Sequence, residues 1–494
     1  MKTINEYLLP GLITGLVLIG VDRSTAQTLT IAPLHSFNIS DHSNPYGGLI
    51  LSGDTLYGTT EGDEFDGSGF GTVFRIKTDG TGFTNLHTFV GSDGASPYGG
   101  MILASNTLYG ASNKGGNWGH GTVFKVNTDG TGFESLHNFA GDADGDAPAT
   151  GLTLSGNTLY GTTFLGGDSN SGTLFAVSTD GVGFRVVHSF TALAGALGVS
   201  GINSDGANPR SGLILSGNTL YGATADGGSS GYGAVFRVDT DGSAFTNLHS
   251  FTGSGFADIT VPNGEGWFPR SGLVLAGNRL YGMAQYGGTG AAGSVFAVST
   301  DGTGFTNLHS FMAGAGPFPN TTNSDGAYPR AGLILSGNTL YGAAAWGGRL
   351  GFGTLFTLNT NGTGFKTLVA FEGAALPGPS PNNGGAAPYG QLVLSNNTLY
   401  GTTLGGGSYG YGTVFKLSLP APQLTAVRSE VNLVLSWPTN DAEFDFTGYT
   451  LQSATDLVPP ATWNTDSPPA SVINGRNTVN NTISGPQKFY RLSQ

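Results

Sequence analysis

The chain contains no cysteine among its 494 residues. A cysteine nucleophile and a cysteine-ligated metal are therefore excluded, and an exported chain of this composition has to be stable without disulfide bonds. Basic residues are also few, because 19 Lys and Arg stand against 32 Asp and Glu and give a formal net charge of −13. This charge argues against nucleic acid and anionic membrane surfaces as partners, since both are bound through clusters of basic side chains.

Long apolar runs are lacking after the N-terminal segment, so we expect no membrane span in the mature chain. The segment itself has Lys2, a largely apolar run from Tyr7 to Val21, and the small residues Ser24-Thr25-Ala26 before Gln27. This order is typical of a secretory signal peptide, which we predict over residues 1–26. The run is short for a membrane anchor. We therefore expect the protein to be secreted or held at the cell surface.

What the sequence does contain is a repeated phrase. Seven copies of a pattern close to G-L-I-L-S-G-N-T-L-Y-G are each followed by a Gly-rich stretch and by a segment close to G-T-V-F. Most of them continue with a segment close to L-H-S-F. The Tyr-Gly pairs of the copies, separated by 51 to 61 residues, begin at Tyr57, Tyr109, Tyr160, Tyr221, Tyr281, Tyr341 and Tyr400. A period of this size indicates a modular array.

Each copy contains four short apolar segments separated by residues typical of turns. In the fourth copy these segments are Leu213–Leu215, Thr219–Ala223, Ala234–Val238 and Thr246–Phe251. Ser-Gly-Asn and Thr-Asp-Gly separate the first pair and the last pair, and both sequences reverse the chain tightly. Each copy therefore predicts a four-stranded antiparallel meander, and such units arranged radially form a β-propeller.

The phase of the repeat predicts how the array closes. The first repeat-like segment, Leu34–Phe37, matches the fourth strand of the later copies, while the last copy stops after its third strand, Gly412–Leu417. The N-terminal strand can therefore complete the last unit and cover an otherwise exposed edge. We predict an all-β fold, with a seven-bladed β-propeller over residues 28–418 closed by this strand.

From about Pro420 the repeat ends and a second domain is predicted over residues 421–494. Five short alternating segments indicate strands at Gln423–Ser429, Asn432–Trp437, Tyr449–Ser453, Thr478–Ile483 and Lys488–Leu492. The aromatic residues expected in its core are Trp437, Tyr449, Trp463 and Tyr490. This pattern favours a small β-sandwich similar to fibronectin type III or immunoglobulin domains.

The repeat resembles a known family. The residues Gly212 to Gly222, with Gly233–Phe236 and Leu248–Phe251, are similar to the GloVer tandem repeat of exported bacterial proteins, whose C-terminal anchoring segments vary. The resemblance implies an exported, cell-surface protein and brings no activity, substrate or catalytic residues with it. The tail of this chain departs from an anchor pattern, because it lacks a terminal hydrophobic helix with a basic end.

Three arginines are candidates for ligand binding. A proline precedes the first strand of every copy, and the residue after it is Arg210, Arg270 or Arg330 in three consecutive copies. The other copies have Tyr46, Tyr98, Ala149 and Tyr389 at this position. On adjacent innermost strands, three guanidinium groups near the mouth of a central channel can bind a carboxylate or sulfate, or stack on a sugar or aromatic ring. The alternative is that they pair with acidic loops and only neutralise the mouth.

Two tryptophans are candidates for stacking on a ligand. Trp118 and Trp346 lie in the Gly-rich segments between second and third strands. Flat aromatic side chains among glycines can stack on pyranose rings or peptide side chains. The alternative is that they pack between neighbouring units.

Acidic and histidine side chains are the possible metal ligands of the chain. Asp142, Asp144 and Asp146 suggest calcium, although Gly145 is misplaced for an EF-hand loop and a solvated turn is the alternative. The repeat histidines lie on the outermost strands and cannot converge on one ion, so we expect a structural role for His35, His87, His137, His188, His249 and His309. Calcium is thus the only cofactor that the sequence suggests.

No catalytic residues are predicted, and three functions stay open. The first is a monomeric binding, adhesion or display module whose partner is a polysaccharide, a cell-envelope component or a protein. The second is a propeller enzyme, a hydrolase or lyase, acting on polysaccharide through carboxylates from the long crossings. The third is a purely structural surface repeat. An enzyme of the second kind needs two acidic side chains facing one pocket, whereas a binding module needs aromatic groups and hydrogen-bond donors.

Overall fold

The computed structural model describes residues 29–62, 69–148, 150–194, 201–253, 261–316, 322–372, 382, 384–429, 432–441, 444–445, 449–455, 462–465, 469–482 and 488–493. The predicted signal peptide lies outside these residues. Two compact units are distinguished: a larger one of Thr30–Leu394 and Leu399–Leu417, and a smaller one that includes Ser418–Gln494. Apart from one short 3-10 turn, Ile39–Asp41, every regular element of the described chain is a β-strand. The described chain offers no helix with the length and apolar character needed to traverse a bilayer.

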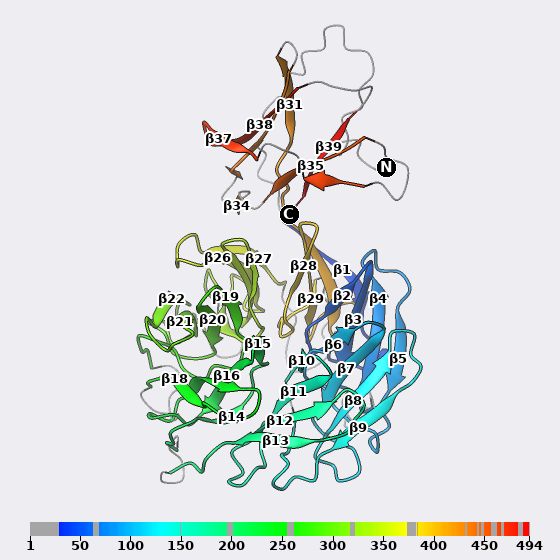
Figure 1. Cartoon of the computed structure of the whole chain (residues 1–494), viewed down its shortest axis with the longest axis vertical. Helices are drawn as coiled ribbons and strands as arrows, with labels where there is room; N and C mark the ends of the chain where they lie inside the picture. Colours follow the sequence, from blue (N-terminus) through cyan, green and yellow to red (C-terminus); the bar gives the residue numbers. More distant parts are fainter. Residues whose placement is uncertain are drawn as a thin grey trace. The chain divides into compact units, whose positions relative to one another are not determined.

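The larger unit consists of antiparallel sheets of four or five strands, numbered here in chain order. Sheets 1 to 3 are four-stranded meanders. Sheet 1 contains β2 (Ile50–Ser52), β3 (Thr55–Thr60), β4 (Thr72–Lys77) and β5 (Thr84–Thr88), and sheet 2 contains β6 (Ile102–Ala104), β7 (Thr107–Ser112), β8 (Thr122–Asn127) and β9 (Glu134–Asn138). Sheet 3 contains β10 (Thr153–Ser155), β11 (Thr158–Thr163), β12 (Thr173–Ser178) and β13 (Arg185–Ser189). The predicted four-strand meander is therefore confirmed. In Figure 1 the sheets follow one another around the larger unit in the order of the colour bar.

Sheets 4 and 6 carry a fifth strand that the repeat pattern does not predict. Sheet 4 contains β14 (Ala207–Pro209), β15 (Ile214–Ser216), β16 (Thr219–Asp226), β17 (Ala234–Asp239) and β18 (Thr246–Ser250). Sheet 5 has the usual four, β19 (Val274–Ala276), β20 (Arg279–Ala284), β21 (Ser294–Ser299) and β22 (Thr306–Ser310). Sheet 6 contains β23 (Ala327–Pro329), β24 (Ile334–Ser336), β25 (Thr339–Trp346), β26 (Thr354–Asn359) and β27 (Lys366–Ala370). The extra strands β14 and β23 lie in long crossings and pair with the extended ends of β16 and β25.

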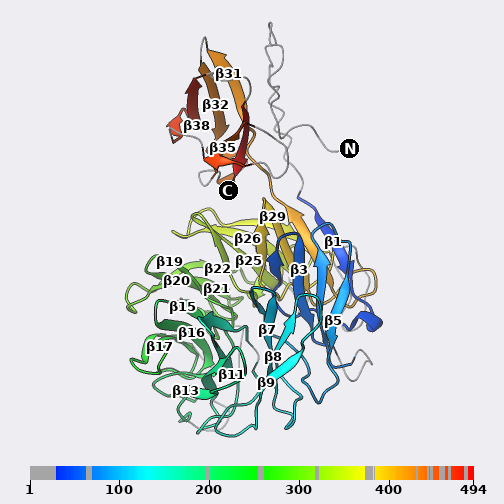
Figure 2. The ribbon, with the colours of Figure 1, turned by 45° about the vertical axis from the view of Figure 1, so that its right-hand side comes forward.

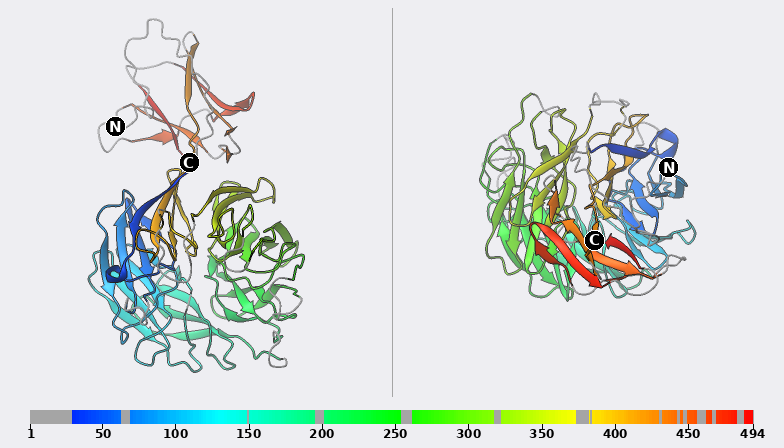
Figure 3. Two further views of the ribbon diagram at one scale, coloured as in Figure 1. Left: turned by 180° about the vertical axis from the view of Figure 1, so that it is seen from behind. Right: turned by 90° about the horizontal axis from the view of Figure 1, so that it is seen from above.

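Sheet 7 is completed by the first strand of the chain. Its strands are β28 (Val393–Ser395), β29 (Thr398–Thr403), β30 (Thr413–Ser418) and β1 (Ile31–Ser36). β1 pairs antiparallel with β30 from Ile31↔Leu417 to Ser36↔Thr413, which is the pairing that the phase of the repeat predicts. The blue β1 accordingly lies against the orange strands in two different views (Figures 2 and 3). Phe37, at the end of β1, has no exposed surface.

Neighbouring sheets share apolar cores in cyclic order. Between sheets 4 and 5, for example, Tyr221, Val235 and Phe251 form one buried cluster with Leu280 and Phe296. Equivalent clusters join sheets 1 and 2, 2 and 3, 3 and 4, and 5 and 6, and another joins sheet 7 back to sheet 1. Sheets 6 and 7 meet through aromatic rings of Phe371 and Phe415, whose centroids are 5.5 Å apart.

The glycine of each Tyr-Gly pair is required by this packing. In sheet 4, a Cβ added to Gly222 would lie 2.6 Å from Cζ of Phe236 and 2.9 Å from Cδ2 of Leu213. The phenyl ring of the third strand therefore lies directly on the backbone of the second. The same contact recurs in the other sheets, where the glycine is Gly58, Gly110, Gly161, Gly282, Gly342 or Gly401.

The repeat histidines lie between sheets, in agreement with their expected structural role. Each ring stacks on a phenylalanine of the next sheet, at 3.5 to 4.1 Å between centroids. Each Nε2 also lies 2.9 to 3.4 Å from a carboxylate oxygen of the following crossing. Burial lowers the pKa of His87, while its hydrogen bond to Asp93 acts in the opposite direction. These histidine rings therefore take part in the packing between neighbouring sheets.

The smaller unit is also built from strands, as predicted. One sheet has the order β31-β32-β38-β37, another has the order β36-β35-β39, and β33 pairs with β34. The neighbouring strands β31, β32 and β38 can be followed in Figure 2. The bounds are β31 (Thr425–Ser429), β32 (Asn432–Pro438), β33 (Asn440–Asp441), β34 (Phe444–Asp445), β35 (Thr450–Ala454), β36 (Asn464–Thr465), β37 (Ser471–Ile473), β38 (Arg476–Thr482) and β39 (Phe489–Ser493). Side chains from both larger sheets, among them Trp437, Tyr449 and Tyr490, form one buried cluster. Trp463, also predicted for this core, lies outside the cluster, and its ring faces the guanidinium of Arg491 at 4.4 Å.

Candidate functional site

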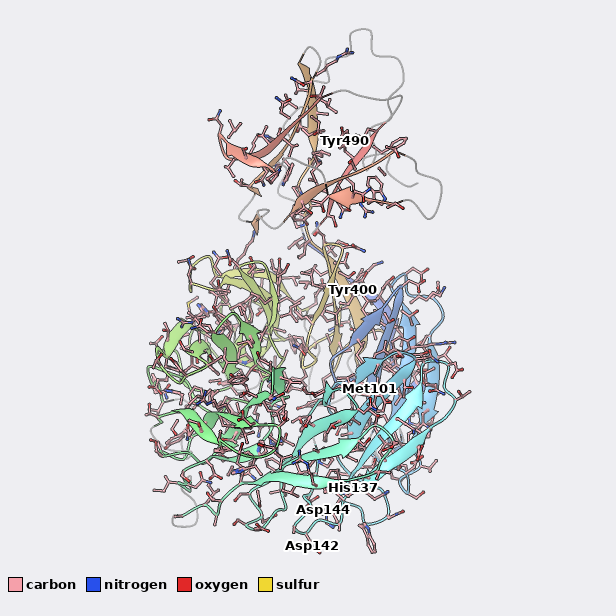
Figure 4. The ribbon with its side chains drawn as sticks, in the orientation of Figure 1. Met101, His137, Asp142, Asp144, Tyr400 and Tyr490 are labelled. Carbon is pink, nitrogen blue, oxygen red and sulfur yellow. The ribbon has the colours of Figure 1, made fainter. Side chains whose placement is uncertain are left out.

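One cavity is lined by the residues that follow the repeat proline of each sheet. Its volume is about 620 Å³, which lies within the range of small-molecule binding sites. Among its lining residues are those that follow the repeat prolines, namely Tyr46, Tyr98, Arg210, Arg270, Arg330 and Tyr389. Ala149, the seventh residue of this set, lies outside the described chain. Met101 of sheet 2 also lines the cavity, and it lies towards the middle of the larger unit in Figure 4.

The lining is divided into two chemically different arcs. Sheets 4, 5 and 6 supply what we call the arginine arc, Arg210, Arg270 and Arg330. Sheets 7, 1 and 2 supply the tyrosine arc, Tyr389, Tyr46 and Tyr98. The ring of Tyr46 lies 4.9 Å from that of Tyr98 and 5.1 Å from that of Tyr389, measured between centroids. One side of the cavity is therefore cationic and the other aromatic.

The guanidinium groups of the arginine arc lie on aromatic faces and not on carboxylates. Arg210 lies 3.6 Å from the ring centroid of Phe164, Arg270 4.1 Å from that of Phe268, and Arg330 4.9 Å from that of Tyr389. Among the described residues, none of the three arginines forms an ion pair. The alternative in which acidic loops neutralise these arginines is therefore not supported by a direct ion pair, although the carboxyl of Asp226 acts electrostatically on Arg210 and Arg270.

The three arginines differ in their hydrogen bonds. The side-chain amide of Gln285 is assigned the orientation in which its oxygen faces the donors around it. In this orientation the oxygen accepts hydrogen bonds from Nε and Nη2 of Arg330 at 3.1 and 3.0 Å. Nη1 of Arg330 also donates a long hydrogen bond, 3.5 Å, to the hydroxyl of Tyr46. In contrast, Nε of Arg210 and Nε of Arg270 are buried without a hydrogen-bond partner in the described structure. Arg330 is thus fixed by the protein, while the other two keep unused donors.

Burial and mutual repulsion act on the charges of this arc. Burial, followed by repulsion from Arg210 and Arg330, lowers the pKa of Arg270 to about 10, so it remains protonated at neutral pH. Asp226, at the end of β16, is the nearby acidic group: burial raises its pKa to about 6, although Arg270 and Arg210 act in the opposite direction. The carboxyl of Asp226 forms no ion pair with either arginine. Asp226 is thus ionised at neutral pH, and against its single negative charge the three guanidinium groups leave a net positive charge at the cavity.

The tyrosine arc is held by contacts behind it. The hydroxyl of Tyr98 donates to Oε1 of Glu61 at 2.5 Å. Burial, together with the charge of Glu61, raises the pKa of Tyr98, so its phenol stays protonated. Tyr389 is buried and has a side-chain hydrogen bond with Trp346. These contacts keep the aromatic wall in one arrangement.

A ring of glycines with one exception forms the next layer of the cavity. Six sheets place Gly48, Gly100, Gly151, Gly212, Gly272 and Gly332 in the lining, and sheet 7 places Gln391 at the same repeat position. The amide of Gln391 donates to the carbonyl of Leu333 at 2.9 Å. A Cβ at Gly332 would lie 3.0 Å from this amide, whereas a Cβ at Gly212 or Gly272 would meet no atom within 4 Å. Free space is therefore available beside sheets 4 and 5.

A comparison with known families bears on this architecture. The pattern of the Gloeobacter/Verrucomicrobia repeat matches residues 20–204, 196–322 and 318–432, which is well over half of the chain. The chain belongs to the Gloeobacter/Verrucomicrobia repeat family. The predicted membership of a bacterial repeat family is thereby confirmed, whereas the fibronectin-like character of the tail stays a prediction.

Solved structures with propeller-like folds are similar to this Gloeobacter/Verrucomicrobia repeat protein at low identity. An oligogalacturonate lyase in complex with manganese is 13% identical with a TM-score of 0.46, and the match covers 79% of this chain and 96% of the lyase. A GH74 enzyme from Niastella koreensis is 13% identical with a TM-score of 0.46, covering 93% of this chain and 72% of that enzyme. A chain of a nidogen/laminin complex is 12% identical with a TM-score of 0.35, covering 62% and 91%. No curated protein sequence matches the repeat protein.

The two tryptophans predicted to bind ligand have different surroundings in the repeat protein. Trp118 is 65% exposed in the segment between β7 and β8, and the backbone of the preceding Asn117 is hydrogen-bonded to Asn138 of the outermost strand. It does not line the cavity. Trp346 is only 8% exposed, because it lies in the extended end of β25 opposite Ala327 of β23. Trp346 is therefore mostly covered by protein, and its side chain is hydrogen-bonded to Tyr389.

The three aspartates considered for calcium in the repeat protein are not brought together on one site. Asp144 pairs with Nε2 of His137 at 3.1 Å, and Asp146 pairs with Nδ1 of His120 at 3.0 Å. Asp142 is exposed, and Figure 4 shows it beyond Asp144 and His137 at the edge of the larger unit, far from Met101 in that view. Within the described residues, no group of three or more His, Asp or Glu side chains is arranged to hold a metal ion. Two of the three carboxylates are therefore paired with histidines, and calcium binding by this loop stays a prediction.

The raised pKa of Asp226 gives a stability prediction. Because the buried carboxyl has a pKa of about 6 in the folded protein, above its usual 3.8, ionisation is penalised in the folded state. Asp226→Asn is expected to increase the free energy of unfolding by about 2 kcal/mol at pH 7.5, where the penalty is complete. The gain should disappear below about pH 3.5, where the wild-type carboxyl is protonated in both the folded and the unfolded state. Urea unfolding at both pH values measures it, with the exposed Asp142→Asn as the control; an equal effect of Asp226→Asn at both pH values would contradict the assignment.

Proposed function

We propose that this repeat protein is an exported, seven-bladed β-propeller that binds polysaccharide or a polysaccharide-containing component of the cell envelope in its ring cavity. In this proposal residues 1–26 are the signal peptide, residues 28–418 form the propeller, and residues 421–494 form a fibronectin-like sandwich that acts as a spacer or docking module. The mature protein is a secreted or surface-held monomer.

The observation that carries the proposal is the convergence of one repeat position on a single cavity. The residue after the repeat proline lines the same space of about 620 Å³ in six described sheets, and Thr150 and Gly151 line it for the remaining sheet. The cyclic order of the shared cores and the pairing of β1 with β30 support seven blades in a closed ring. Ligands of ring-shaped β folds bind where the inner strands and their loops converge.

The chemistry of the lining favours binding over catalysis. Hydrolysis of a glycosidic bond usually needs two carboxyl groups facing the same substrate. Among the described residues that line the cavity there is no Asp or Glu, and the nearby Glu61 accepts a hydrogen bond from Tyr98. A propeller hydrolase or lyase therefore remains the second candidate, and a purely structural surface repeat the third.

A glycan-binding screen on residues 27–494, with release of reducing ends measured in the same wells, tests the proposal. We expect saturable binding without release. A variant with Gly212→Gln and Gly272→Gln should lose it, because these substitutions put side chains into the open part of the cavity, as Gln391 already does in sheet 7. Trp118→Ala should bind normally, since Trp118 lies away from the cavity. Release of reducing ends would support the propeller hydrolase or lyase. Absence of both binding and release would support the purely structural role.

A further inference from the structure

We propose that the ligand is an acidic saccharide, whose carboxylate or sulfate group lies between Arg210 and Arg270 and whose sugar ring lies towards the tyrosine arc. This inference rests on the proposed polysaccharide binding and specifies the chemistry of the same cavity. It also gives the residues of the arginine arc different roles. Arg210 and Arg270 contact the anion, and Arg330 positions the tyrosine arc.

The first argument is the unbalanced charge of the cavity. Three guanidinium groups of adjacent sheets line one space and repel one another, and burial lowers the pKa of Arg210 and Arg270. Burying a charge is unfavourable unless it is paired. No described carboxylate forms an ion pair with any of the three. An anionic ligand would supply the missing negative charge, and planar guanidinium groups match carboxylate and sulfate oxygens well.

The second argument is the distribution of unused donors. Nε of Arg210 and Nε of Arg270 are buried without a partner, and an unsatisfied buried donor is unfavourable. Nε and Nη2 of Arg330, in contrast, reach the amide oxygen of Gln285. The free hydrogen-bonding capacity of the arc is therefore concentrated on its first two members.

The third argument is that free space lies beside the same two arginines. Gly212 and Gly272 follow Arg210 and Arg270 by two residues, and both line the cavity with no atom within 4 Å of an added Cβ. Beside Arg330, the side chain of Gln391 occupies the corresponding space over Gly332. A ligand group can therefore approach Arg210 and Arg270 more closely than Arg330.

The fourth argument is the tyrosine arc, which adjoins the arginine arc where Arg330 lies over the ring of Tyr389. Tyr46 packs against Tyr98 and Tyr389 and offers a surface of aromatic carbon beside the cationic side. The apolar face of a sugar ring packs well on aromatic side chains, while a simple inorganic anion would make no use of them. The combination of the two arcs thus fits a sugar that carries an acidic group better than either a neutral sugar or a bare anion.

The test uses calorimetry with residues 27–494 and four probes: a uronic acid trisaccharide, a sulfated disaccharide, a neutral hexose trisaccharide and citrate. We expect the wild-type protein to prefer one or both acidic saccharides over the neutral one and over citrate. Arg210→Gln and Arg270→Gln should each weaken binding of the acidic saccharide by about 10-fold or more, because each removes a charged hydrogen-bond donor. Arg330→Gln should weaken it less, and the exposed Arg349→Gln, which makes the same change of charge, should leave it unchanged.

The outcomes separate this inference from the proposed function. Equal binding of neutral and acidic saccharides, with loss of both in the Gly212→Gln/Gly272→Gln variant, would overturn the inference and keep the polysaccharide site. Citrate binding as tightly as the acidic saccharides would overturn the role of the sugar ring. An effect of Arg330→Gln larger than that of the other two would overturn the division of the arc. Absence of binding to every saccharide would overturn both proposals. Circular dichroism of each variant confirms that it is folded.

Discussion

Removal of residues 28–37 is expected to lower the free energy of unfolding of the larger unit by at least about 5 kcal/mol and its melting temperature by about 5 °C or more. The segment contains β1, whose pairing with β30 runs from Ile31↔Leu417 to Ser36↔Thr413. It also contains Phe37, which is fully buried between sheets 7 and 1. Truncating one buried phenylalanine typically costs about 3 to 5 kcal/mol, and here the strand pairing is lost with it.

The exposed edge should have a second effect. Without β1, the backbone groups of β30 that now bond to it would face solvent, and an unpaired edge strand promotes association between chains. We therefore expect the truncated protein to self-associate in sedimentation velocity experiments. The control is the chain from residue 27, and a synthetic peptide of residues 28–37 added in trans should restore part of the lost stability. An unchanged melting temperature in the truncated chain would show that β1 does not close the ring.

Gly222→Val is expected to lower the free energy of unfolding by about 3 kcal/mol. An added Cβ would lie 2.6 Å from Cζ of Phe236 and 2.9 Å from Cδ2 of Leu213, both of which are held by the core. Phe236 cannot retreat easily, because its ring stacks on Phe245 at 5.4 Å and packs edge-on to Phe190 of sheet 3 at 5.5 Å. The contact therefore has to be relieved by moving the strands.

Gly272→Val provides the matched control for this steric argument. It makes the same chemical change at a glycine whose added Cβ meets nothing within 4 Å, so its effect on unfolding should be within about 0.5 kcal/mol. Combining Gly222→Val with Phe236→Leu should cost less than the sum of the two single substitutions, since the smaller side chain makes room for the valine. Additive effects, or equal effects of the two valines, would show that close packing of the phenyl ring is not what requires glycine.

Most of the fold follows from the spacing of residues along the chain. The repeated Tyr-Gly pair, with turn sequences on either side, predicts four strands in each unit, and the phase of the first and last copies predicts the partner of β1. The extra strands β14 and β23 could not be predicted in this way. Each is three residues long and contains proline, and each pairs with a second strand of eight residues, β16 or β25. In the described chain, sheets 2, 3, 5 and 7 have only a single isolated bridge at the equivalent place.

The candidate site could be predicted in position but not in detail. The place of the arginines after the repeat proline predicts that they face one cavity, because equivalent residues of a cyclic array converge. Which arginine is already satisfied depends on Gln285, which reaches Arg330 from a neighbouring sheet. The different exposure of Trp118 and Trp346 likewise depends on β23, which pairs with the segment that contains Trp346. Gln391 could have been singled out from the sequence, because the other six copies of the repeat have glycine at this position.

The separation of the two arcs on opposite groups of sheets has a consequence for the geometry of recognition. A ring of seven equivalent units would present the same surface in every direction and would let a ligand rotate about the axis. Here the cationic residues of sheets 4 to 6 and the aromatic residues of sheets 7, 1 and 2 create an electric field that points across the opening. In the proposed complex, the charged group of a saccharide would therefore face sheets 4 to 6, and the ligand would be held at one angle about the axis of the ring.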